Sequence, residues 1–294
     1  FIPGPIDVKE EVLQKMATPM IGHRGKDASM LQKSISEKMQ KLFYTNNTIL
    51  LSTSSGTGLM EGSIRSCTSK KAAVFSCGSF GDRWYKMAVA NNVPADIFKV
   101  ELGEATTPEM VDKVLSTGEY DLITVTHNET STGIRNPIEE IGEVVKKYED
   151  VIYCVDTVSS AGGIKVEVDK IGIDICITSV QKALGLPPGM SICTFSQKAI
   201  DRAKQVPFRG VYLDLLAMYE YLIKKNYQYP STPSLSHMFA LDFQLDNILD
   251  EGLDNRFNRH EDMANLVRNW AKKHFQIFTN ENHLSNTLTV IENT

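Results

Sequence analysis

Short apolar runs alternate with helical patterns along most of this chain, and that alternation constrains its fold more than any other feature. Six runs are mostly continuous in apolar residues, which is typical of strands covered on both faces. The predicted strands are 49–53, 72–77, 96–101, 121–126, 151–155 and 173–178. The predicted helices are 30–43, 58–67, 80–91, 108–115 and 137–148. This order indicates an α/β fold, with a mainly parallel sheet and helices on both faces.

A seventh apolar run, residues 190–195, follows the sixth strand too closely to be parallel to it. The link contains the segment Gly-Leu-Pro-Pro-Gly at 185–189. A parallel crossover needs about a dozen residues or more. The sequence therefore predicts a seven-stranded sheet in which this last strand is antiparallel.

Three parts of the chain follow from these patterns. Pro3 and Pro5, with Gly4 between them, rule out regular structure at the start, so residues 1–20 are expected to form an N-terminal arm that begins extended. Residues 21–250 form the large domain. Residues 251–294 begin with an amphipathic linking helix, near 255–275, and end in a run, 287–292, that resembles the first strand of a new unit.

Charge and cysteine content exclude several classes of function. The 31 basic and 36 acidic residues are mixed along the chain, so no basic stripe indicates nucleic acid, and no apolar run is long enough to cross a membrane. The partner is expected to be a small molecule or another copy of the chain. The five cysteines never form a C-x-x-C pair, which favours buried thiols in a reducing cytoplasm over a disulfide or a metal site.

The loop after the first strand, Ser-Ser-Gly-Thr-Gly at 54–58, has the composition of a phosphate site. Its glycines let backbone N–H groups approach a ligand, the helix N-terminus that follows favours an anion, and Thr57 adds a hydroxyl. Helix capping by Ser and Thr is the alternative interpretation.

Two further loops carry ring-binding or hydrogen-bonding side chains. Phe80 lies between two glycines after the second strand, where it can lie flat on a heteroaromatic ring or simply pack in the core. Asn128 and Thr130 follow the fourth strand and can donate to a phenolate oxygen. The neighbouring His127 has no second ligand at metal spacing, so no metal site is predicted.

Asp156 and Lys182 follow two further strands. A buried carboxylate needs a cationic or donor partner, and a pyridinium N–H is one. A lysine after a buried strand tends to have a lowered pKa, which makes its amine a nucleophile and later a base. The alternative interpretation of Asp156 is an ordinary helix cap, and that of Lys182 is a solvated surface residue. An amine and an acid on neighbouring strands are also what pyridoxal 5′-phosphate (PLP) requires.

Together these segments resemble the class V branch of fold-type I PLP enzymes, and specifically the alanine/serine–glyoxylate (or –pyruvate) aminotransferases. The resemblance extends over nearly the whole chain. It rests on GP at 4–5, GHR at 22–24, SGTG at 55–58, GSFGDR at 78–83, HNETSTG at 127–133, VDTVSS at 155–160, SVQKAL at 179–184, PPG at 187–189 and YPSTP at 229–233.

The resemblance implies a role for each matching residue. Lys182 would form the Schiff base with PLP, and Asp156 would pair with the ring nitrogen. Phe80 and Val158 would cover the two ring faces, while Thr130 and Asn128 would bind the ring oxygen. The implied phosphate ligands are Thr57, Gly58, Leu59 and Gln181, joined by Tyr229 and Thr232 from the second subunit of a homodimer with shared active sites. Gly4, Pro5 and Gly25 would line the substrate end.

The implied reaction is transamination of alanine or serine with a 2-oxo acid such as glyoxylate or pyruvate. Another class V activity, cysteine desulfuration or a kynureninase-like hydrolysis, remains an alternative. Relatives also continue into a small C-terminal domain that carries a carboxylate-binding arginine. We expect that domain to be largely missing here, which leaves PLP binding without turnover as a further alternative.

Overall fold

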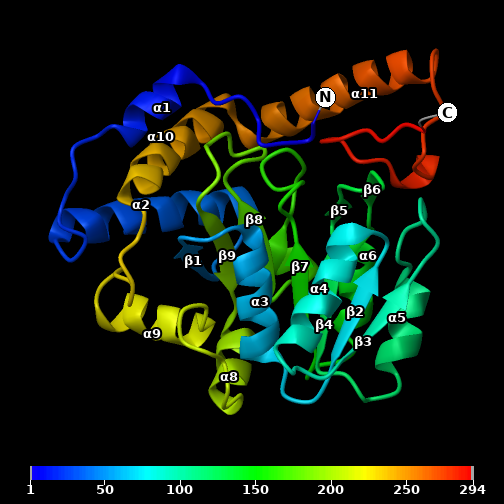
Figure 1. Ribbon diagram of the computed structural model, residues 1–294, viewed down its shortest axis with the longest axis horizontal. Coiled ribbons are helices and arrows are strands. Elements are labelled where there is room, and N and C mark those ends of the chain that lie inside the picture. The colour runs from blue at the N-terminus through cyan, green and yellow to red at the C-terminus, as the bar shows by residue number, and fades with distance from the viewer. Residues whose placement is uncertain (1, 293–294) are drawn as a thin grey trace.

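A seven-stranded sheet forms the centre of the computed structural model, which describes residues 2–292 (Figure 1). Its strands are β1 (Thr48–Ser52), β2 (Ala72–Ser76), β3 (Ala95–Lys99), β4 (Leu122–Thr126), β7 (Ile152–Asp156), β8 (Ile175–Ser179) and β9 (Ser191–Phe195). They lie in the order β1-β9-β8-β7-β4-β2-β3. β9 runs antiparallel to both of its neighbours, and every other pair is parallel. The predicted fold class is thus confirmed.

Helices cover the sheet. Every residue of β2, β4, β7, β8 and β9 is buried. Because successive side chains of a strand point to opposite faces, these strands must be covered on both sides. The helices are α2 (Lys26–Phe43), α3 (Gly56–Cys67), α4 (Ser79–Ala90), α5 (Pro108–Leu115), α6 (Ile138–Val145), α7 (Val168–Ile171), α8 (Gln197–Gln205), α9 (Leu215–Lys224), α10 (Leu235–Glu251) and α11 (Leu253–Ala271).

The N-terminal arm is more ordered than the sequence predicted. Residues 2–9 have no regular structure, as expected, but α1 (Glu10–Met16) follows and packs on α10. Its two acidic residues at the N-terminal end and Lys15 in the last turn complement the helix dipole. Only Val12 of this helix is buried, so its apolar periodicity is too weak to recognise. Phe1 of the predicted arm lies outside the described residues.

The predicted strand over 287–292 is wrong for the residues that the structure describes. Ile291 makes only an isolated bridge to Ile277. The preceding segment packs against the sheet domain instead, through a bridge between Leu284 and Ile134. Residues 293–294 of the predicted C-terminal unit lie outside the described residues. A short β5–β6 pair (Asn128–Glu129, Ile134–Arg135) and a 3₁₀ turn, η1 (Glu281–His283), were also unpredicted.

The topology brings distant loops to one edge of the sheet. β1 is antiparallel to β9, which is antiparallel to β8, so β1 points the same way as the parallel strands. The loops after β1, β2, β4, β7 and β8 therefore meet at the carboxyl edge. The N-terminal residues and α11 lie at this edge as well (Figure 1).

Candidate active site

A cavity of about 320 Å³ lies at the carboxyl edge of the sheet, between the five loops that meet there. Most of the predicted site residues line it, although they are far apart in the sequence. Those that do so are Gly4, Pro5, Thr57, Phe80, Asn128, Thr130, Asp156, Val158, Gln181 and Lys182.

Lys182 is half-buried in the loop after β8, with the N-terminal arm against it. Its Nζ donates to the carbonyl of Pro3 at 3.1 Å. A Cβ atom on Gly4 would lie 2.9 Å from Lys182 Cδ and 3.0 Å from Nζ, and the φ of Gly4, 143°, favours glycine at this position. Burial lowers the pKa of the amine, and the charge of Asp156 opposes this shift. The structure thus places in the cavity wall a lysine whose neutral form is favoured by burial.

Asp156 ends β7 and is 3% exposed. Its Oδ1 accepts a hydrogen bond from the amide of Val158 at 2.8 Å, and no described lysine, arginine or histidine forms an ion pair with it. Burial raises the pKa of this carboxyl to about 6. A buried acid of this kind is stabilised by a cationic N–H donor.

The loop after β1 gives the opposite end of the cavity its anion-binding character. α3 begins at Gly56 behind Ser55, whose side chain does not cap the helix, which disfavours the capping interpretation. Arg83 Nη1 donates to Thr57 Oγ1 at 2.9 Å. This adds a cation to a helix N-terminus and a hydroxyl, a combination that suits a phosphate.

Gly56 sets how closely this helix approaches the sheet. A Cβ there would lie 2.7 Å from Ser179 Oγ and 2.7 Å from Val158 Cγ2. Ser179 Oγ is buried and has no hydrogen-bond partner. Gly56 thus lets the helix N-terminus meet the ends of β7 and β8.

Phe80 is held by a residue that the sequence did not single out. Glu129 is fully buried, and its Oε2 accepts from the amides of Phe80 and Gly81, both at 3.0 Å. Its Oε1 accepts from the amide and hydroxyl of Ser131. The guanidinium of Arg83 also lies over the Phe80 ring, 4.6 Å from its centroid. The bonds from the amides of Phe80 and Gly81 to Glu129 cross 49 and 48 residues of sequence, so no local pattern predicts them.

Asn128 and Thr130 play different parts in the structure. The Thr130 hydroxyl lies 2.7 Å from that of Ser159 and lines the cavity. The amide nitrogen of Asn128 points to the C-terminal segment, where it donates to Ser285 Oγ and Thr287 Oγ1, both at 2.7 Å. Its donor is therefore engaged elsewhere, and Thr130 is the better candidate to donate to a ring oxygen.

Gly58 and Leu59 lie in the first turns of α3 and do not line the cavity. The Gly58 amide is engaged with the Ser55 carbonyl at 2.9 Å, and the Leu59 side chain is in the core. Any role in phosphate binding would thus come from the helix end as a whole.

Three predicted residues lie away from Lys182 in this chain. Gly25 is exposed at the start of α2. Tyr229 is buried, and its hydroxyl accepts from the amide of Leu51 at 2.8 Å. Thr232 is exposed on the loop beside it. A contribution of Tyr229 and Thr232 to the site of a second subunit stays a prediction.

Neither a metal cluster nor a helix able to span a membrane occurs within residues 2–292. The arrangement instead offers an amine, a buried acid, an aromatic face and an anion-binding helix end around one cavity. A planar, cationic heteroaromatic ring that carries an aldehyde and a phosphate complements all four.

Known proteins show the same architecture. A family model described as "Aminotransferase class-V" matches residues 8–288. An uncharacterized aminotransferase of Methanocaldococcus jannaschii is 46% identical over 91% of this chain and 70% of its own length. The L-aspartate–glyoxylate aminotransferase of Paracoccus denitrificans is 30% identical over 91% of this chain and 69% of its own. The crystal structure of an alanine–glyoxylate aminotransferase from Nostoc sp. superposes with a TM-score of 0.93, at 27% identity, over 99% of this chain and 78% of that one.

Proposed function

Because this chain belongs to the class-V aminotransferase family of PLP-dependent enzymes, we propose that it transfers the amino group of alanine or serine to a 2-oxo acid such as glyoxylate or pyruvate. The observation that carries this proposal is the convergence of Lys182 and Asp156 on one cavity from neighbouring strand ends. Glyoxylate occurs in the names of both characterised relatives above, which supports it as the acceptor.

The residues present fit PLP. Asp156 is a buried carboxyl that forms no ion pair within residues 2–292, and a ring N–H would supply such a partner. Lys182 offers an amine for the aldehyde. Thr57, Arg83 and the N-terminus of α3 would hold the phosphate, and Gly56 lets this helix end lie close to Ser179 and Val158. Phe80 and Val158 would pack on the ring faces.

When bound, PLP supplies an aldehyde that combines with amines and a ring that takes up the electron pair left when a proton leaves the substrate Cα. Asp156, once ionised, would hold a proton on the ring nitrogen. The lowered pKa of Lys182 increases its neutral fraction, so its Nζ can take the Cα proton and return it. The arm residues Gly4 and Pro5 would limit the side chain of the substrate.

We also propose a homodimer in which Tyr229 and Thr232 complete the phosphate site of the partner subunit. The exposed position of Thr232 supports this arrangement. All five cysteines are buried and unpaired, which supports a reducing compartment, the cytoplasm. Their burial also disfavours cysteine desulfuration, which needs a thiol that can reach the substrate.

The test is to incubate the purified chain and PLP with L-serine plus glyoxylate or pyruvate, or with L-alanine plus glyoxylate, and to measure the new amino acid and the new 2-oxo acid. We expect both products, and neither from Lys182→Ala. L-aspartate, L-cysteine and L-kynurenine serve as competing substrates. Sulfide from cysteine or alanine from kynurenine, without transamination, would replace the proposal with another class V activity. PLP binding without any product would leave a binding protein.

A further inference from the structure

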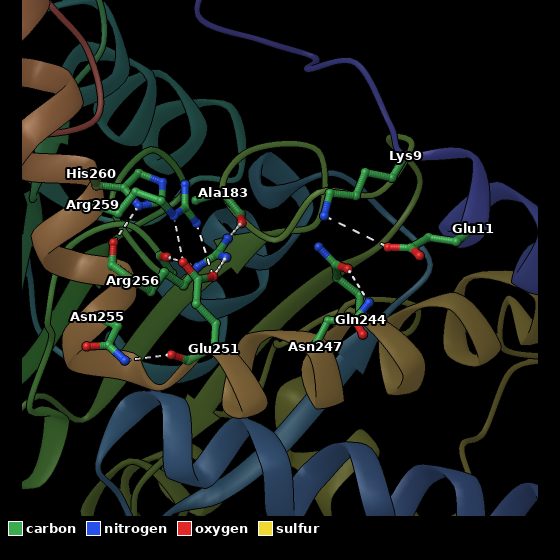
Figure 2. Close-up of polar contacts among 11 residues, drawn as sticks. Lys9, Glu11, Ala183, Gln244, Asn247, Glu251, Asn255, Arg256, Arg259 and His260 are labelled. Carbon is green, nitrogen blue, oxygen red and sulfur yellow. Dashed lines mark hydrogen bonds and ion pairs between the residues drawn. The ribbon is translucent and has the colours of Figure 1, made fainter.

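A second cavity, of about 610 Å³, lies on the far side of Lys182, where α10 meets α11. Its wall contains a linked group of charged residues, Glu251, Arg256 and Arg259, which we call the α10–α11 ion cluster (Figure 2). None of its three residues was predicted as a site residue, yet Arg256 contacts the loops that carry Asp156 and Lys182.

Arg256 is buried, and all three nitrogens of its guanidinium are engaged. Nε donates to the carbonyl of Gly162 at 2.6 Å, and Nη2 donates to the carbonyl of Ala183 at 2.5 Å. Nη1 pairs with Glu251 Oε2 at 2.8 Å. Three of the five N–H groups of this guanidinium are thus engaged with the protein itself.

The two carbonyls belong to the two loops that carry the reacting groups. Ala183 directly follows Lys182, and Gly162 lies in the loop that begins after Asp156. The loops also touch each other, since a Cβ on Gly162 would lie 3.3 Å from Leu184 Cδ2 and 3.6 Å from Ala183 Cβ. One side chain from α11 thus spans the junction between them.

Glu251 orients this side chain. It accepts from Arg259 Nε at 2.6 Å and Nη2 at 3.0 Å, as well as from Arg256. The bonds from Arg259, followed by those from Arg256, lower the pKa of Glu251 to about 2, so it stays ionised near neutral pH. Arg259 supports Arg256 through Glu251 and makes no described hydrogen bond to either loop (Figure 2).

We propose that Arg256 is a positioning residue that fixes Lys182 relative to Asp156, an inference that rests on the proposed function. The planar fork of arginine can donate to two carbonyls and a carboxylate at once, whereas lysine is a single point donor. Removing it would leave buried carbonyl oxygens unpaired and let the Lys182 loop move. Its action is through position, because Arg256 bonds to the backbone of the Lys182 loop and does not contact the Lys182 amine.

The experiment adds PLP and borohydride to the full chain and follows attachment at Lys182 by peptide mass spectrometry. Arg256→Lys is compared with wild type, together with kcat, KM and the melting temperature. Arg202→Met is the control. Arg202 is also a mostly buried arginine, and it donates to the carboxylate of Asp121 and to the backbone carbonyl of Asp150. It lies at the opposite end of the sheet from Lys182.

We expect slower attachment at Lys182 in Arg256→Lys and a fall in kcat of up to about 100-fold, with a smaller change in KM. Arg202→Met should lower the melting temperature without slowing attachment. The inference would be overturned if Arg256→Lys attached PLP at the same rate as the wild type and had the same kcat. If Arg256→Lys does not fold, Arg259→Met takes its place, because it removes the bonds from Arg259 that hold Glu251. We expect this variant to lose part of the attachment rate and of kcat. An unchanged attachment rate in Arg259→Met would equally overturn the inference. A wild-type chain that PLP does not label at Lys182 would refute the proposed function first.

Discussion

The carboxyl group of Asp156 makes the stability of the chain without PLP depend on pH. Its pKa is raised by burial from 3.8 to about 6. Between these values the folded chain binds more protons at this group than the unfolded chain does, so the free energy of unfolding falls as the pH rises from about 4 to about 6. The fall is on the order of 3 kcal/mol and persists above pH 6.

Asp156→Asn should remove this fall, because asparagine does not ionise. We expect the variant to melt at a higher temperature than wild type at neutral pH and at a similar temperature near pH 4, measured without PLP, and to lose transamination. His127, whose pKa burial lowers to about 3, titrates in both chains and cancels in the comparison. If the melting temperatures of the two chains changed with pH by the same amount between pH 4 and pH 6, the ionised form of Asp156 would not destabilise the folded chain.

Individual residues differ in how far the sequence could predict them. Lys182 and Asp156 were predictable because each follows a recognisable buried strand. Arg83 and Glu129 were not, since their contacts with Thr57 and with the amide of Phe80 cross 26 and 49 residues of sequence. The partners of the Asn128 amide nitrogen, Ser285 and Thr287, were not predictable either, since they lie 157 and 159 residues away.

At the scale of an element, the approach of α3 to the sheet depends on Gly56. Alanine is normally the better helix former. Here its Cβ would collide with Ser179 and Val158, so we expect Gly56→Ala to cost about 1–3 kcal/mol and to weaken PLP binding. Gly22→Ala, whose Cβ meets nothing within 4 Å, is the control. Chemical unfolding and PLP titration of both variants check this, and equal behaviour would show that the helix end can shift freely.

Elements with a strong apolar period were predictable, and short ones were not. The strands of the main sheet and the helices α2, α3, α4, α6 and α11 lie within a few residues of their predicted bounds, and α5 matches its prediction. No bounds were predicted for α8, α9 and α10. α7 has four residues and β5 and β6 have two each, which is too short for a period to show. The run 287–292 is strand-like in composition, but hydrogen bonds that the Asn128 amide nitrogen donates to the Ser285 and Thr287 hydroxyls hold the start of this segment against the sheet domain.

At the scale of the whole molecule, the proposed homodimer with shared active sites has a direct test. Lys182→Ala and Thr232→Ala should each lack most activity as separate dimers. If Thr232 serves the partner's site, a mixed dimer contains one site with both substitutions and one with neither. We therefore expect activity to return when the two inactive proteins are unfolded together and refolded. Mixtures that stay inactive would indicate that each chain builds its own site.

The antiparallel strand β9 joins the earliest strand to the rest of the sheet, because β1 pairs with no strand except β9 among residues 2–292. Thr48 therefore pairs with Phe195, and Ser52 with Ser191. During synthesis on the ribosome, β1 has no partner strand until residue 195 has emerged. The anion-binding loop that follows β1 can take up its final place only then, so the ability to bind the cofactor should arise late in the translation of this chain.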